Sequence, residues 1–94
     1  MTNREFWQLK KDDLIRDTMR DRDMRIIKRE VLDEVVGMII SKYHTQDIKN
    51  GRKYVQLTCV DQKGNTWYYD STRKDNIDHL HKLSLLDLLQ NGLR

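Results

Sequence analysis

A chain of 94 residues is long enough for one modest hydrophobic core and too short for two, so we expect a single domain spanning residues 1–94. Its 18 basic and 15 acidic residues leave a net charge of +3, which is compatible with a polyanionic partner without requiring one. The N-terminal residues lack the apolar run of a signal peptide, no segment approaches the ~20 apolar residues of a membrane span, and the single cysteine cannot form an internal disulfide; these features predict a cytoplasmic protein without a membrane partner.

The N-terminal third is expected to be helical. Thr2 and Glu5 have the spacing of a capping box, in which a hydroxyl and a carboxylate each bond a free backbone N–H at a helix start. From Asn3 to about Asp21 the apolar residues form a broken helical stripe on a charged surface, namely Phe6, Trp7, Leu9, Leu14, Ile15 and Met19.

Residues 21–33 fit two interpretations. Met24, Ile27 and Val31 recur at helical spacing, whereas the β-branched pair Ile26-Ile27 also suits a short strand. We expect helix to about Leu32, either continuous with the first helix or separate from it. The predicted helical segment therefore covers residues 3–32.

Residues 35–70 predict a three-stranded antiparallel meander. Asn50-Gly51 between β-rich runs is a strong hairpin signal, because a type I′ turn needs positive φ at both central residues. A second turn is expected at residues 61–64, with Gly64 in a left-handed position. The run from Arg52 to Val60 lies between the two turns, is rich in β-branched and aromatic residues, and is the expected central strand.

The two faces of this central strand differ in chemistry. Alternation places Val55, Leu57 and Cys59 on an aliphatic side and Tyr54, Gln56 and Thr58 on a mixed side. Counting outward from Asn50-Gly51 puts Tyr43 opposite Thr58, on the mixed side. The third strand, residues 65–69, adds either Trp67 and Tyr69 or Tyr68 to that side, depending on whether Gly64 makes a bulge; we expect Trp67 and Tyr69.

The C-terminal segment, about residues 76–91, is expected to be a helix or a helix pair. A polar loop ends at Asp75, and Ile77 begins an apolar stripe. Its leucines are expected to cover the aliphatic side of the sheet or to seal a homodimer through Leu83, Leu86 and Leu89. The predicted fold class is therefore α+β, with an N-terminal helix, a three-stranded antiparallel meander and a C-terminal helix or helix pair.

The sequence offers little that would support catalysis. It has no Ser-His-Asp order, no paired carboxylates in an apolar context, no phosphate-binding glycine loop and no CxxC motif. His79 and His81 are two residues apart and would point in different directions on a helix, and Cys59 is expected to be a small buried hydrophobe. We predict a protein that is not an enzyme, with no catalytic residues, no metal site and no cofactor.

The mixed side of the sheet is the best candidate for binding. Aromatic rings on an exposed sheet stack on bases, and nearby cations hold phosphates, which favours single-stranded nucleic acid as the ligand. The alternative is that these rings form cross-strand pairs and part of the core. The candidate binding residues are Tyr43, Arg52, Lys53, Tyr54, Gln56, Thr58, Trp67, Tyr69 and Arg73.

The meander resembles the first three strands of an OB-fold, with a glycine early in the first strand (Gly37), the turn at Asn50-Gly51, and an Asp-x-x-Gly turn ending at Gly64. The resemblance implies oligonucleotide binding on the face that carries Tyr54, Gln56, Thr58 and Trp67. In length, charge density and lack of proline the chain is also similar to small bacteriophage proteins that block a host factor. The second hypothesis is therefore a protein–protein interaction module that binds a host protein through its N-terminal helix or a sheet edge.

Overall fold

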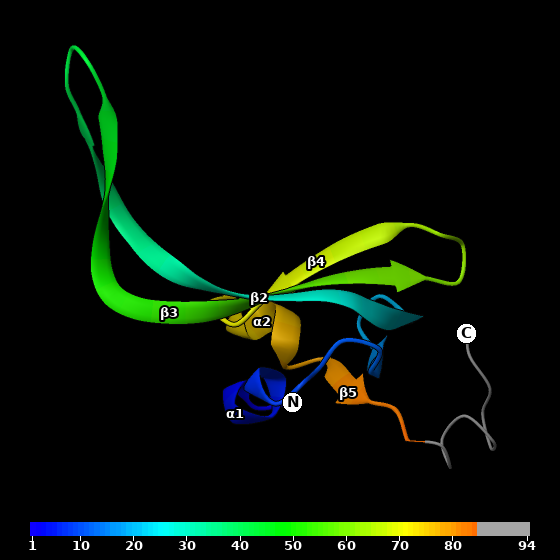
Figure 1. The fold of residues 1–94 in the computed structure, drawn as a ribbon. Helices are drawn as coiled ribbons and strands as arrows, with labels where there is room; N and C mark the ends of the chain where they lie inside the picture. Colours follow the sequence, from blue (N-terminus) through cyan, green and yellow to red (C-terminus); the bar gives the residue numbers. More distant parts are fainter. Residues whose placement is uncertain (85–94) are drawn as a thin grey trace.

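The computed structural model describes residues 1–84, which form an antiparallel sheet with two short helices (Figure 1). Five strands lie in the order β4-β3-β2-β1-β5 within this part of the chain. The elements along the chain are α1 (Asn3–Trp7), β1 (Leu14–Asp17), β2 (Arg22–Ile40), β3 (Thr45–Asp61), β4 (Thr66–Asp70), α2 (Lys74–Ile77) and β5 (Leu80–Lys82).

The predicted α+β arrangement with long helices is wrong, because α1 has five residues and α2 has four. The capping box is confirmed: the Glu5 backbone N donates to the Thr2 hydroxyl at 3.2 Å, and the Thr2 backbone N donates to the Glu5 carboxylate at 3.0 Å. The helix nevertheless ends at Trp7. A turn follows, in which Asp13 accepts a hydrogen bond from the Lys10 backbone N at 2.9 Å and Asp12 has a φ of 76°.

Residues 22–33 are strand, so the predicted helix to Leu32 is wrong. Met24 and Ile26 are both buried and alternate with residues on the other face, which is the period of a strand. β1 pairs with the beginning of β2 on one side. On the other side, β3 pairs with β2 along nearly its whole length. Hydrogen bonding to neighbouring strands therefore outweighs the helical spacing of the apolar residues.

The hairpin between β2 and β3 turns at Ser41 and His44, so the turn predicted at Asn50-Gly51 is wrong. The Ser41 backbone N donates to the His44 carbonyl at 2.8 Å. Asn50 and Gly51 instead lie inside β3, where the pairing jumps from Asp33–Lys53 to Val35–Lys49. Gly51 has a φ of 80°, and the Asn50 side chain accepts a hydrogen bond from the Arg52 backbone N at 2.9 Å. The positive φ of Gly51 therefore belongs to an irregularity within the strand and not to the hairpin turn.

The second predicted turn is confirmed. Gly64 has a φ of 82°, and its backbone N donates to the Asp61 carbonyl at 3.1 Å. The Asp61 carboxylate accepts from the backbone N of Lys63 and of Asn65, each at 2.9 Å. These bonds hold the carboxyl in its charged form, and the hydrogen bond from Trp67 is the largest of several causes that lower the pKa of Asp61.

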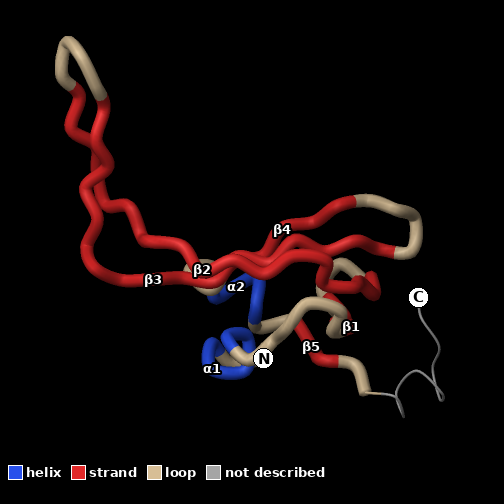
Figure 2. Tube along the Cα trace, viewed as in Figure 1, coloured by secondary structure: helices blue, strands red, loops and turns tan. Residues whose placement is uncertain are grey.

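The core lies on one face of the sheet, which we call the inner face because α1 and α2 cover it (Figure 2). The predicted aliphatic side of the central strand is confirmed as part of it. The buried side chains of the cluster are Phe6, Leu9, Ile15, Met24, Ile26, Val55, Leu57, Cys59, Tyr69, Ile77 and Leu80.

The predicted C-terminal helix from about residue 76 is confirmed only at its first residues, which belong to α2 (Lys74–Ile77), and is wrong beyond them. Residues 80–82 form β5, which pairs with β1, in place of the expected helix. Leu83 is buried, and its backbone N donates to the Leu14 carbonyl at 2.8 Å. The remainder of the predicted helix, with Leu86 and Leu89 of the predicted dimer, lies outside the described residues.

The outer part of the β2–β3 hairpin leaves the body of the protein (Figure 1). We call residues 34–52 the arm. No residue of the arm is buried, and the long axis of the molecule measures 58 Å. The other face of the sheet, opposite the inner face, is called the outer face.

We predict that Gly64→Ala lowers the free energy of unfolding by about 1 kcal/mol, because an L side chain at positive φ is strained by roughly that amount. Gly51→Ala is the matched control, since its φ is equally positive and a Cβ at either glycine would meet no atom within 4 Å. Strain in the arm is relieved by local opening of the arm, so the control should change global stability less. Urea unfolding followed by circular dichroism measures the free energy of unfolding of both variants. A larger loss for Gly51→Ala than for Gly64→Ala would contradict the prediction that the arm opens independently of the body.

Candidate functional site

The arm exposes a dense group of apolar side chains. Ile40 is 76% exposed and Tyr43, at the tip, is 86% exposed. Soluble proteins expose single apolar residues commonly, but contiguous apolar patches mark interaction sites. The exposed apolar residues of the arm are Val35, Val36, Met38, Ile39, Ile40, Tyr43 and Ile48.

These side chains occupy both faces of the arm. Directly opposite residues of an antiparallel pair share a face, and Met38 lies opposite Asp47 while Ile39 lies opposite Gln46. By alternation, Ile40 shares the face of Met38, and Ile48 shares the face of Ile39. A flat surface would cover only one of these faces.

The outer part of the arm, residues 35–48, is nearly uncharged. Lys42 and Asp47 are the only Asp, Glu, Lys or Arg residues among residues 35–48, so their charges cancel. Cations gather instead at its base, where Lys53 and Lys49 lie 2.6 and 3.2 Å from the carboxylate of Asp33. The hydrogen bond from Lys53 is the first of the causes that lower the pKa of Asp33.

The four aromatic residues predicted as one platform are dispersed. Tyr43 is at the tip of the arm, so its predicted place opposite Thr58 is wrong. Tyr54 is half-buried on the outer face. Tyr69 and Trp67 lie opposite Leu57 and Cys59, which places them on the inner face, against the prediction.

The polar candidates also divide between regions. Gln56 and Thr58 lie with Tyr54 on the outer face, as predicted, and Thr58 pairs with Tyr68. Tyr68, the alternative to Trp67 and Tyr69 for that face, is 65% exposed there. Three further candidates are exposed but lie away from the outer-face residues. They are Arg52 and Lys53 at the base of the arm and Arg73 just before α2.

Trp67 and Tyr69, which were predicted on the outer face, belong to a buried polar network on the inner face. The Asp17 carboxylate is buried and accepts from the Tyr69 hydroxyl at 2.7 Å and from Arg20 at 3.0 Å. Burial by itself raises the pKa of Asp17, but these hydrogen bonds outweigh it and the net pKa is lowered. Burial, followed by the bond to Asp17, raises the pKa of Tyr69 to about 12, so the hydroxyl stays a donor at neutral pH.

Trp67 extends this network to the second turn. The Arg22 guanidinium lies 3.4 Å from the Trp67 ring centroid and also donates to the Tyr69 hydroxyl at 3.2 Å. The Trp67 indole N–H donates to Asp61 at 2.8 Å. Both rings are therefore engaged in holding the sheet together. Sequence spacing gave no sign of this, because Asp17 and Arg22 are about 50 residues away from Tyr69 in the chain.

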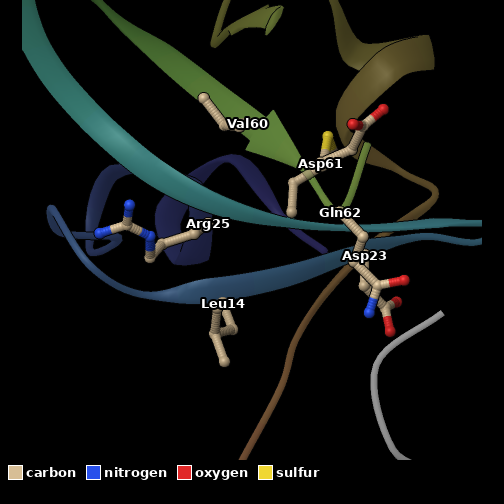
Figure 3. Close-up of a pocket in the computed structure, with 7 residues that line it drawn as sticks. Leu14, Asp23, Arg25, Val60, Asp61 and Gln62 are labelled. Atoms are coloured by element: carbon tan, nitrogen blue, oxygen red, sulfur yellow. The ribbon is translucent and has the colours of Figure 1, made fainter. Parts of the chain in front are cut away.

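A small pocket lies at the body end of the sheet, between β1, β2 and the end of β3 (Figure 3). Its volume is about 240 Å³, below the roughly 300 Å³ at which ligand sites begin. The buried Asp23 beside it accepts hydrogen bonds from Arg16 at 2.7 and 3.0 Å. We therefore assign no ligand to this pocket. The residues that line it are Leu14, Asp23, Met24, Arg25, Val60, Asp61 and Gln62.

Reactive and metal-binding groups are also sparse in the part of the chain that the structure describes. Among residues 1–84, no three His, Cys, Asp or Glu side chains come close enough to hold a metal ion. Cys59 is buried, and burial raises the pKa of its thiol to about 12, which confirms it as a small hydrophobe. Over the same residues, no helix has the length and apolar character that crossing a membrane requires.

The fold and the arm define an open antiparallel sheet that carries a projecting β-hairpin. No protein-family model matches the sequence, and no curated protein or solved structure matches it significantly. The resemblance to an OB-fold stays a prediction. Any functional proposal therefore depends on the residues and geometry described above.

We predict that Tyr69→Phe lowers the free energy of unfolding at pH 7 by about 2 kcal/mol, because it removes a donor from a buried charge. Since the folded-state pKa of Asp17 lies below its ordinary value of 3.8, its contribution to stability is present above that value and is lost as pH falls through the folded pKa. The substitution raises the folded pKa, so acid unfolding should begin at a higher pH. Tyr68→Phe, on the exposed neighbouring residue, is the control; equal effects from both would refute the network's role.

Proposed function

We propose that this chain is a non-enzymatic protein-binding module that docks through its arm. The observation that carries the proposal is the group of seven exposed apolar side chains on a hairpin outside the core. A two-stranded ribbon without a covering element is at best marginally stable in water. A partner that covers the arm would stabilise it as well as bind it.

Burying the exposed apolar side chains of the arm would stabilise a complex. Fully burying one Val, Ile or Met side chain stabilises by about 1.5–3 kcal/mol, and six aliphatic side chains of the arm are roughly half exposed or more. Their burial would supply on the order of 5 kcal/mol or more before the cost of association. Because these side chains lie on both faces, a partner with a groove, or one that adds a strand, fits better than a flat surface.

The charge distribution favours a protein over a nucleic acid at this site. Affinity for nucleic acid depends largely on the release of counterions when cations meet phosphates. Residues 35–48 of the arm have no net charge, so this contribution is small there. The outer face gathers only Tyr54 and Tyr68 of the aromatic residues, which weakens the case for single-stranded nucleic acid as the ligand.

The route of docking also follows from burial. α1 packs into the body with Phe6 buried and Trp7 half-buried, so the N-terminal helix is poorly placed to bind a partner. A sheet edge, the other route considered, remains available along the arm. This arrangement supports an interaction module of the kind represented by small inhibitors that bind a target protein.

We predict that Met38→Asp abolishes capture of a protein partner, because burying a carboxylate in an apolar contact is strongly unfavourable. The experiment compares the tagged full-length chain with this variant in nuclease-treated extract of the source cells, followed by mass spectrometry of stoichiometric bands. Met19→Asp is the matched control, since Met19 and Met38 are 53% and 56% exposed and Met19 lies in the loop between β1 and β2.

The expected result is one partner retained by the wild type and by Met19→Asp, with at least tenfold less retained by Met38→Asp. Thermal unfolding should be unchanged in both variants, since neither side chain is buried. Recovery of nucleic acid alone before nuclease treatment, or equal retention by Met38→Asp, would contradict the proposal.

A further inference from the structure

We infer that the arm pairs with a second copy of this chain, through the free edge of β3 and about a twofold axis at Ile48. This inference rests on the proposed function, because it names the protein that the arm binds. It is carried by three features of residues 45–49, namely an unpaired edge, the direction of the backbone groups and a self-complementary order of charges.

The outer edge of β3 is open along the arm. β4 pairs with β3 only from Gln56 to Val60, and Ser71 continues the contact as far as Val55. From Tyr54 to Thr45, β2 is the only strand beside β3 within the described residues. An exposed strand edge is a template for pairing with another chain.

The direction of the backbone groups can be followed from the tip. In an antiparallel ladder, opposite residues alternate between pairs that bond each other and pairs whose amides point away. The Ser41 backbone N donates to the His44 carbonyl, so these two residues form a bonded pair. The register is unbroken from Ile40–Thr45 to Gly37–Ile48, so the amides of Thr45, Asp47 and, one alternation on, Lys49 point outward.

A twofold axis at Ile48 matches this pattern. It places Asp47 opposite the partner's Lys49, and Lys49 opposite the partner's Asp47, so that two outward-pointing pairs bond each other. The same two pairs bring opposite charges together on one face. An axis at Asp47 or at Lys49 would instead place like charges opposite each other, which disfavours those registers.

The axis also joins apolar surface. Ile48 would lie against the partner's Ile48, and each already packs beside its own Gly37, where a Cβ would stand 3.6 Å from Ile48 Cδ1. The resulting four-stranded ribbon extends the face that carries Ile39. Both strands of the arm are irregular near its base, β2 between Val35 and Gly37 and β3 at Asn50-Gly51. The regular edge of β3, residues 45–49, is nevertheless longer than that of β2, residues 37–40, which favours pairing through β3.

Sedimentation equilibrium of the purified full-length chain tests the inference. The wild type should dimerise at micromolar to submillimolar concentration. In Asp47→Lys, a lysine at position 47 would face Lys49 of the second copy; in Lys49→Asp, Asp47 would face an aspartate. Because like charges repel, each variant alone should show at least a tenfold higher dissociation constant. An equimolar mixture of the two should recover dimers, because every pair is then of opposite charge.

The mixture of the two variants is the decisive measurement. Lys49 also contacts Asp33 of its own chain, so a loss of dimer in Lys49→Asp has an intrachain explanation, whereas recovery on mixing does not. A monomeric wild type, variants that dimerise as the wild type does, or a mixture that stays monomeric would each overturn the inference.

Cysteine cross-linking tests the position of the axis. Ile48→Cys should oxidise to a disulfide-linked dimer, because an opposed pair that is not hydrogen-bonded has its Cα atoms about 4.5 Å apart, within disulfide range. Gln46→Cys is the control: it faces the partner's Asn50, so its two copies lie about four residues, or ~13 Å, apart along the ribbon. Cys59 does not compete, since it is buried.

Equal cross-linking of Ile48→Cys and Gln46→Cys, or faster cross-linking of Met38→Cys, would overturn the β3 register.

The self-pairing and the proposed function can fail separately. A monomeric wild type that still loses its captured partner on Met38→Asp would overturn the self-pairing and leave the arm as a protein-binding element. Dimerisation together with equal capture by Met38→Asp would keep the self-pairing through β3 and overturn the role given to the exposed apolar side chains in capturing another protein.

Discussion

The antiparallel pairing of β2 with β3 is the interaction on which the rest of the structure depends. The ladder runs from Met24–Asp61 to Ile40–Thr45 and has two different environments. Its inner part is flanked by β1 and β4 and covered on one face by the helices, so its side chains build the core. Its outer part has none of these neighbours among the described residues, so the same pairing leaves apolar side chains in water.

The buried network around Asp17 explains why the aromatic residues of the sheet do not form one exposed platform. A buried carboxylate is tolerated only when several donors surround it. Tyr69 and Arg20 supply donors, and Arg22 in turn stacks on Trp67. Two of the four rings that would have formed a stacking platform are thereby required inside, where they join β4 to β1 and β2.

The arm combines properties that carry a cost in an isolated protein. Its apolar side chains and open edges are features that commonly lead to aggregation, and the lack of net charge in residues 35–48 does little to oppose association. Such a surface is understandable when a partner covers it. Pairing of two arms through β3 would close one open edge of each chain and would set opposite charges against each other, so specificity would come from the order of Asp47, Ile48 and Lys49.

The sequence by itself determined the features that depend on neighbouring residues: the capping box at Thr2, the turn ending at Gly64, and the alternation that buries Val55, Leu57 and Cys59. Its local signals were ambiguous elsewhere. Positive φ at Gly51 suits a hairpin turn and a strand irregularity alike, and the apolar residues from Met24 to Val31 fit a helix or a strand. Only the tertiary structure decided these cases, because a strand is stable when a partner strand supplies its hydrogen bonds, and that partner lies far away in the chain. It also decided which face Trp67, Tyr68 and Tyr69 occupy, since a shift of one residue in register exchanges the two faces of a strand.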